Sequence, residues 1–194
     1  MFLLTEPKDE RFFEAHWGHG RIRLDQAEFD KLWDWVDGTR PLTMESVSAR
    51  VDLENLTRWF LAVAFAATRD AYQGPGQLGD RTREAAPWFW DNWDMDQSYR
   101  SWDLDSYQYL LERINEDRRG RNRAEPRAAL LTNLIAEDAA YRDYFMRVFQ
   151  HVMNHRLTPA FLEERYRHYE EQARLLGVED TSYLPRLKSF LARR

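Results

Sequence analysis

The sequence contains no cysteine among its 194 residues. Disulfide bonds, thiolate zinc sites and cysteine nucleophiles are therefore excluded. Long apolar stretches are also missing, since the longest run, Trp59 to Ala67, is far too short to span a bilayer. The N-terminal residues show no basic region followed by an apolar segment, which is the pattern of a secretory signal. From these absences we expect a soluble cytoplasmic protein.

A surplus of positive charge is absent as well. The formal net charge of −5 argues against a protein whose main partner is nucleic acid. Charged residues make up 31% of the chain and aromatic residues 14%, a composition typical of a globular protein rather than a disordered one. The length suits one domain with a substantial core. We therefore expect a single domain over residues 1–194, with neither nucleic acid nor membrane as a partner.

Helical periodicity is the commonest pattern in the chain. An Asp-x-x-Glu capping pattern at Asp25 predicts a helix that ends near Gly38. Residues 39–49 predict a loop with room for one turn of helix. Asp52 is the expected N-cap of a helix that runs to about Asp70 and is apolar on nearly every side, which is typical of a central helix.

From Asp105 onward the pattern predicts helices only. Pro126 suits the first turn of one helix, and Asp138 is the expected N-cap of the next. Thr158 and Pro159 open another helix, which Gly177 closes. A last helix carries apolar residues at helical spacing, namely Leu184, Leu187, Phe190 and Leu191.

Strand patterns are confined to the first half of the chain. Residues 88–93 contain three tryptophans and a phenylalanine, and such bulky aromatic residues favour a buried strand. Phe2 to Glu6 and Arg21 to Leu24 are further short strand candidates. The sequence therefore predicts an α+β fold, with a small antiparallel sheet and a mainly helical C-terminal portion.

The aromatic strand ends in two carboxylates, Asp94 and Asp96. Carboxylate oxygens suit a hard divalent ion such as Mg²⁺, although aspartates are also common in surface turns after strands. Asp70 lies just past the central helix, in a glycine-rich turn, and the two loops can converge in space. In phosphoryl transfer, one carboxylate orients the nucleophilic hydroxyl while another holds Mg²⁺ on the phosphates.

Other candidate sites have simpler interpretations. His151 and His155 are four residues apart, but Val152 stands where a zinc protease needs glutamate, so we interpret them as a helix-surface pair. His16 and His19 have no third metal ligand nearby in the sequence. The arginines between residues 118 and 127 suit either an acidic or phosphorylated ligand or a solvated loop.

A calcium-binding loop starting at Asp94 is rejected on two grounds. Tyr99 occupies the sixth position of such a loop, where glycine is needed for the sharp turn. The residues that precede Asp94 also read as a strand, whereas an EF-hand needs a helix there.

Several short motifs follow one another in a characteristic order over most of the chain. They are Phe2–Glu6, Val51–Leu56, Asp70, Trp93–Asp96, Leu130–Leu134, Ala140–Phe145, Leu157–Leu162 and Leu187–Arg194. Their order and spacing resemble the CotH family of atypical protein kinases, which is known from spore-coat proteins of bacteria. Each motif is short, so the resemblance depends on the order of the motifs.

The resemblance implies a divergent protein-kinase-like fold that uses ATP and Mg²⁺ to phosphorylate serines of partner proteins. By position, Asp70 resembles the catalytic aspartate that orients the substrate hydroxyl. Asp94 resembles the metal-binding aspartate, with Asp96 as a second oxygen ligand or an outer partner. On this basis we expect the chain to correspond to the C-terminal lobe of such a kinase.

The sequence departs from the family pattern in three respects. The loop asparagine that supplies a second metal ligand falls near Pro75 or Gly76, which leaves Gln77 as its replacement in cofactor binding. Thr68 stands where asparagine is usual, two residues before the catalytic aspartate. The lysine and the glycine-rich cover that a kinase places over the phosphates are not recognisable, which suggests a fragment without its N-terminal lobe.

Two alternatives to a kinase follow from these departures. One is a truncated or degenerate relative that acts as a protein-binding module without catalysis. The other is a different metal-dependent phosphoryl enzyme, such as a hydrolase that uses the same carboxylates.

Overall fold

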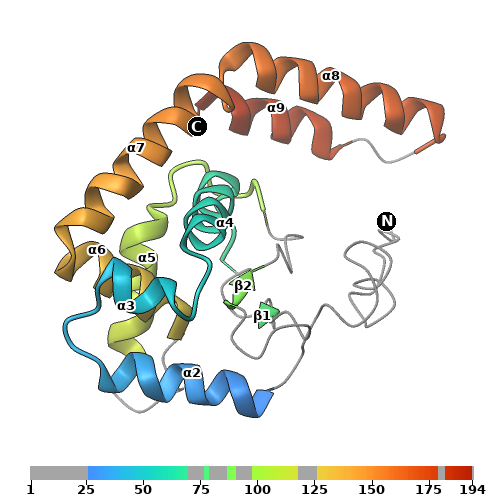
Figure 1. Cartoon of the computed structure of the whole chain (residues 1–194). Helices are drawn as coiled ribbons and strands as arrows, with labels where there is room; N and C mark the ends of the chain where they lie inside the picture. Colours follow the sequence, from blue (N-terminus) through green and yellow to red (C-terminus); the bar gives the residue numbers. More distant parts are fainter. Residues whose placement is uncertain are drawn as a thin grey trace.

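The computed structural model describes residues 26–69, 77–78, 87–90, 98–117, 126–178 and 182–193, and these residues are mainly helical (Figure 1). The helices are α2 (Gln26–Gly38), α3 (Met44–Ser48), α4 (Leu53–Ala66), α5 (Ser106–Asp117), α6 (Pro126–Glu137), α7 (Ala139–His155), α8 (Pro159–Leu175) and α9 (Tyr183–Arg193). The strands are β1 (Gln77–Leu78) and β2 (Phe89–Trp90). Among the residues described, no helix is both long and apolar enough to cross a membrane.

Helix α4 is the central helix of the core, as its composition predicts. The Asp52 side chain accepts a hydrogen bond from the Asn55 N–H at 2.9 Å, which confirms Asp52 as the N-cap. Eight of the fourteen residues of α4 are buried. These side chains form a wide buried face that packs against α3, α7 and β2, and Glu54, Arg58 and Ala62 form the exposed face of the helix.

Within the described residues the sheet is small. Strands β1 and β2 pair antiparallel, with Gln77 opposite Trp90 and Leu78 opposite Phe89. Each strand has two residues in the described part of the chain. The fold is therefore better described as mainly helical, because a pair of such strands buries little surface of its own and depends on α4 for support. The strand candidates before residue 26 and residues 91–93 lie outside the described residues.

Helix α7 joins the core through a buried tyrosine. Tyr141 is completely buried, and its hydroxyl oxygen lies 2.8 Å from Thr57 Oγ1 on α4. Thr57 donates its hydroxyl proton to the Leu53 carbonyl at 2.7 Å, so Tyr141 is the donor to Thr57. This pair connects α4 to α7 across an otherwise apolar core, in which leucines of α6 are also completely buried, namely Leu130, Leu131 and Leu134.

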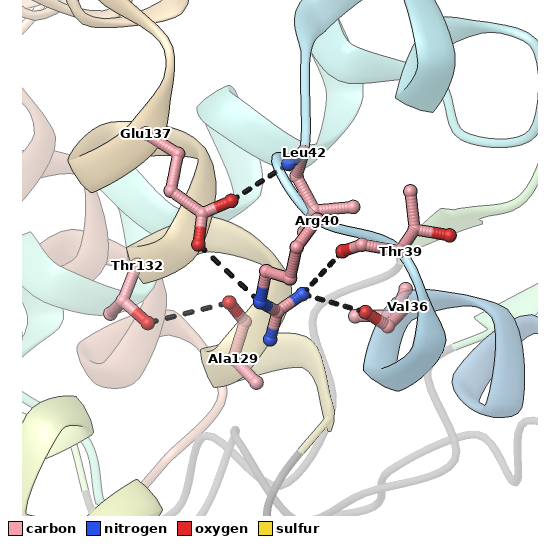
Figure 2. A network of polar contacts seen from close by, with 7 residues as sticks. All are labelled: Val36, Thr39, Arg40, Leu42, Ala129, Thr132 and Glu137. Carbon is pink, nitrogen blue, oxygen red and sulfur yellow. Dashed lines mark hydrogen bonds and ion pairs between the residues drawn. The ribbon is translucent and has the colours of Figure 1, made fainter.

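A polar network connects the segment between α2 and α3 to the junction of α6 and α7 (Figure 2). Glu137 accepts the backbone N–H of the fully buried Leu42 at 2.7 Å and forms an ion pair with Arg40 at 3.4 Å. Next to it, Asp138 caps α7 and also accepts the Met44 N–H. Two acidic residues therefore attach α3 to helices that are more than 90 residues away in the sequence.

Helices α8 and α9 lie side by side at one end of the molecule (Figure 1). Thr158 caps α8, and Pro159 is its first residue, as the sequence predicts. Gly177 follows the helix with φ of +63°, a conformation that glycine adopts without a Cβ clash. Phe190 of α9 packs edge-on against Phe65 of α4 and against Tyr99, which attaches this pair of helices to the core.

Candidate functional site

The aromatic strand is attached to the N-terminal end of α4. Asp52 donates its backbone N–H to the Trp88 carbonyl at 2.8 Å, and Trp88 donates its own to the Arg50 carbonyl at 2.7 Å. These two bonds form a parallel bridge between Val51 and Trp88. The start of the strand is thus held by the residues that also begin the central helix.

Asn55 holds the end of the same strand. Its side-chain amide donates to the Trp90 carbonyl at 2.9 Å, and its side-chain oxygen accepts the Trp90 N–H at 2.6 Å. The Trp90 side chain is buried and lies beside Trp59 of α4, with ring centroids 6.3 Å apart. A two-residue strand exposes backbone groups that need partners, and the single Asn55 side chain supplies two of them.

The C-terminal end of α4 comes earlier than the sequence predicts. The helix ends at Ala66 rather than near Asp70, because Ala67 adopts a left-handed conformation with φ of +50°. The Thr68 N–H then returns to the Val63 carbonyl at 3.4 Å. This return to an earlier carbonyl is the usual way in which a helix C-terminus satisfies its last acceptors.

A second segment of the chain meets α4 at this end. Tyr99 donates its backbone N–H to the Ala66 carbonyl at 2.7 Å, and Ser106 donates its hydroxyl to the Ala64 carbonyl at 3.3 Å. Residues 98–106 are therefore held against the last turn of the central helix.

Arg69, the residue before Asp70, is also held near the C-terminal end of α4. The Tyr109 hydroxyl of α5 donates to the Arg69 carbonyl at 3.4 Å, and the Arg69 guanidinium lies over the Tyr109 ring at 5.8 Å from its centroid. Both α5 and the segment after residue 97 thus converge on the end of α4.

The predicted carboxylates themselves lie outside the described residues, namely Asp70, Asp94 and Asp96. Their described neighbours are nevertheless close together, because residue 70 follows Arg69 at the end of α4 and residues 94 and 96 precede Tyr99, which bonds to the same end. The backbone of Gln77 pairs with that of Trp90 in the small sheet. The side chain of Gln77 lies outside the described part of the structure.

The described residues bring together no group of three or more metal-ligating side chains. His151 and His155 are exposed on α7, with ring centroids 5.0 Å apart. His16, His19 and the arginines from 118 to 123 lie outside the described residues.

Comparison with known protein families found a match. The family model described as CotH kinase protein matches residues 4–188, which is nearly the whole chain. The chain belongs to the CotH kinase family. Comparison with curated proteins found no match, and comparison with solved structures found none.

Membership of the CotH family implies a nucleotide and a divalent metal. Two hydroxyl groups near the end of α4 bear on whether the described residues suit such ligands. Thr68 Oγ1 and Ser98 Oγ are buried and have no hydrogen-bond partner within the described part of the chain. Thr68 lies two residues before Asp70, and Ser98 lies two residues after Asp96. A buried hydroxyl without a partner costs about 1–3 kcal/mol, so such groups usually have a partner in the functional state.

The local charge also suits a CotH-type metal site. The C-terminal end of a helix carries a partial negative charge, which favours a cation nearby. Hydroxyl and carboxylate oxygens are the donors that Mg²⁺ and its bound waters prefer. The two hydroxyls and the end of α4 are thus compatible with a cation nearby, whereas the carboxylates of the predicted site lie outside the described residues.

One important residue of this CotH chain is not evident from sequence reasoning. Asn55 lies within the quoted Val51–Leu56 motif, where helical periodicity explains only the apolar positions. Its partner, Trp90, is 35 residues away, so no local pattern could indicate the contact. The signal available in the sequence was a polar residue, Asn55, three residues after the predicted N-cap Asp52.

Proposed function

We propose that this CotH-family chain transfers a phosphoryl group from ATP to a serine of a partner protein. The serine Oγ attacks the γ-phosphorus, the bond from that phosphorus to the β–γ bridging oxygen breaks, and ADP leaves. In this proposal Asp70 orients the serine hydroxyl and accepts its proton. Asp94 and Asp96 hold Mg²⁺, which neutralises charge on the phosphates when it is bound.

The hydrogen bond from Tyr99 to Ala66 carries this proposal. Phosphoryl transfer needs the hydroxyl-orienting carboxylate and the metal-binding carboxylates in one place, because positioning and charge neutralisation supply most of the catalysis. The segment before Tyr99 and the segment after Ala66 contain these carboxylates. Arg69 and Tyr99, which are described and lie near these carboxylates in the sequence, are both held near the C-terminal end of α4, and Asn55 holds β2 near its N-terminal end.

Calorimetric titration of the chain with ATP and MgCl₂ tests the proposal. We expect nucleotide binding that requires Mg²⁺ and that weakens at least tenfold in Asp94→Asn, since the amide removes a charge from the metal site. Asp70→Ala should keep nucleotide binding but lose phosphoryl transfer to a serine-containing protein. The matched control is Asp34→Asn, an exposed aspartate of α2, which should bind as the wild type does.

Two results would contradict the proposal. One is binding that is equally tight with and without Mg²⁺, and the other is an Asp94→Asn variant that behaves like Asp34→Asn. Phosphate release from ATP without any protein acceptor would indicate a hydrolase.

A protein-binding module without catalysis is the second candidate. Thr68 supports it, because this completely buried residue stands where the family pattern has asparagine. Tight binding of a partner protein by a chain that binds no nucleotide would favour this candidate.

A further inference from the structure

A groove of about 520 Å³ lies between α4 and the pair α8–α9. Its lining is mostly apolar, with Leu61 and Phe65 from α4, Phe161 and Leu162 from α8, and Leu187 from α9. The volume is in the range of sites that enclose a small ligand or a few side chains of a peptide.

One end of the groove adjoins the candidate phosphoryl-transfer site. Ala66 and Tyr99 both line the groove, and they are the two residues joined by the backbone hydrogen bond described above. A chain segment lying in the groove would therefore pass close to the end of α4. This is where an acceptor serine has to be presented, if the proposed function holds.

Arginines line the groove although the whole chain carries a net charge of −5, and the nearest carboxylates are Glu54, paired with Arg58, and Glu170, which accepts from the Tyr166 hydroxyl. Three arginines line it, namely Arg58, Arg156 and Arg165, and none of its described lining residues is acidic. Arg58 forms an exposed ion pair with Glu54 at 2.6 Å, and such a pair contributes little and exchanges readily. Arg156 and Arg165 have no carboxylate within ion-pair distance in the described part of the chain.

Aromatic side chains remain exposed beside these arginines. Phe161 is 43% exposed and Tyr169 is 51% exposed. The Arg165 guanidinium lies over the Tyr169 ring at 5.3 Å from its centroid and donates to the Tyr169 hydroxyl at 3.3 Å. A stacked guanidinium keeps its outer N–H groups free for a carboxylate, which is how arginine commonly recognises acidic partners.

We propose that this groove binds a segment of the acceptor protein in which acidic residues flank an apolar side chain. The apolar side chain enters the groove between α4 and α8, and the carboxylates meet Arg156 and Arg165. The inference rests on the proposed function for the identity of the bound segment as acceptor. The charge of the groove is opposite to that of the whole chain, so it selects acidic segments that the rest of the surface repels.

Peptide binding followed by fluorescence anisotropy tests this inference. The probe is a labelled ten-residue peptide with one phenylalanine, one serine and four glutamates. The comparison peptide has lysine in place of each glutamate. We expect the acidic peptide to bind at least tenfold more tightly, and its affinity to fall as salt is raised because exposed charges are screened.

Two double variants with the same change in net charge complete the test. Arg156→Glu with Arg165→Glu should weaken binding of the acidic peptide at least tenfold. Arg147→Glu with Arg174→Glu, which changes exposed arginines of α7 and α8 outside the groove, should leave binding within about twofold. Circular dichroism confirms that both variants keep their helices.

Equal loss in both double variants, or preference for the lysine peptide, would overturn the inference. The titrations contain no ATP, so they report on the groove alone. Acidic-peptide binding with no phosphoryl transfer would contradict the proposed function and leave the groove as a protein-binding site. Phosphoryl transfer by a chain that shows no preference for the acidic peptide would contradict the groove inference and leave the proposed function in place.

Discussion

Tyr141 shows how much one residue contributes at the centre of the core. Burial of its hydroxyl is the main reason that the pKa of Tyr141 is raised to about 12, and the nearby Tyr144 adds to the effect. The folded protein therefore keeps this proton more tightly than the unfolded chain, in which tyrosine titrates near 10. The resulting stabilisation is complete below pH 10 and is lost as pH rises through 12.

We predict alkaline destabilisation centred on Tyr141. A shift of two pKa units corresponds to about 3 kcal/mol of unfolding free energy lost between pH 10 and 12. Tyr141→Phe should remove most of this loss and cost about 1 kcal/mol at pH 7, because Thr57 keeps its bond to Leu53. Urea denaturation at pH 8, 10 and 11.5 measures both effects. The control, Tyr183→Phe on the surface of α9, should follow the wild-type pH dependence.

Residue-scale prediction from sequence succeeds where the cause is local. Asp52, Asp138 and Thr158 are N-caps as the sequence predicts, because a cap bonds to backbone groups two or three residues away. The second role of Asp138, as acceptor for Met44, depends on a residue 94 positions away. The Met44 N–H is the main reason that the pKa of Asp138 is lowered, and no sequence pattern indicates it.

At the scale of elements, α4 and β2 form one unit because Asn55 satisfies both backbone groups of Trp90. The strand is too short to persist without such support. Its position determines where the chain enters residues 91–97, which carry the predicted metal ligands. The clamp therefore connects the packing of an aromatic strand to the candidate site.

We predict that Asn55→Ala lowers the unfolding free energy by about 2 kcal/mol, because two buried backbone groups lose their partners. It should also weaken Mg²⁺-dependent nucleotide binding, although Asn55 is not proposed to touch the nucleotide. Asn55→Asp, which retains an acceptor for the Trp90 N–H, should be intermediate.

Chemical denaturation and calorimetry measure these two effects of Asn55→Ala. Asn154→Ala, on the exposed side of α7, should change neither by a measurable amount. Full nucleotide affinity in a destabilised Asn55→Ala protein would show that the clamp does not position the site.

The lengths of elements are predicted less well than their existence. The aromatic run predicts a strand over residues 88–93, of which residues 88–90 are described and form a two-residue strand with a bridge at Trp88, whereas residues 91–93 lie outside the described residues. The central helix ends before Asp70 because Ala67 turns left-handed. Alanine disfavours that conformation, so we attribute the helix end to the long-range bond from the Tyr99 N–H to the Ala66 carbonyl.

At the scale of the whole molecule, distant segments are joined by a few polar contacts. Glu137 and Asp138, at the junction of α6 and α7, hold the segment from Arg40 to Met44 (Figure 2). The Leu42 residue is buried, so water is not available to its N–H and Glu137 supplies the acceptor. The junction therefore connects the first helices of the described chain to the later ones.

We predict that Glu137→Ala lowers the unfolding free energy by about 1–2 kcal/mol, since it leaves the Leu42 N–H without its acceptor. Urea denaturation measures the change. The control is Glu163→Ala, which removes an exposed ion pair with Arg167 and should cost less than about 0.5 kcal/mol. Equal costs in the two variants would show that the junction stabilises no more than a surface pair does.

The sequence by itself determined the helical composition, most helix starts, the identity of the central helix and the family. These depend on periodicity, capping side chains and the order of motifs, all of which are local or read directly along the chain. The tertiary structure alone decided the clamp of Asn55 on Trp90, the convergence of two segments on the end of α4, and the arginine-lined groove beside it. Each of these joins residues 30 or more positions apart, and such contacts exist only once the core has brought the helices together.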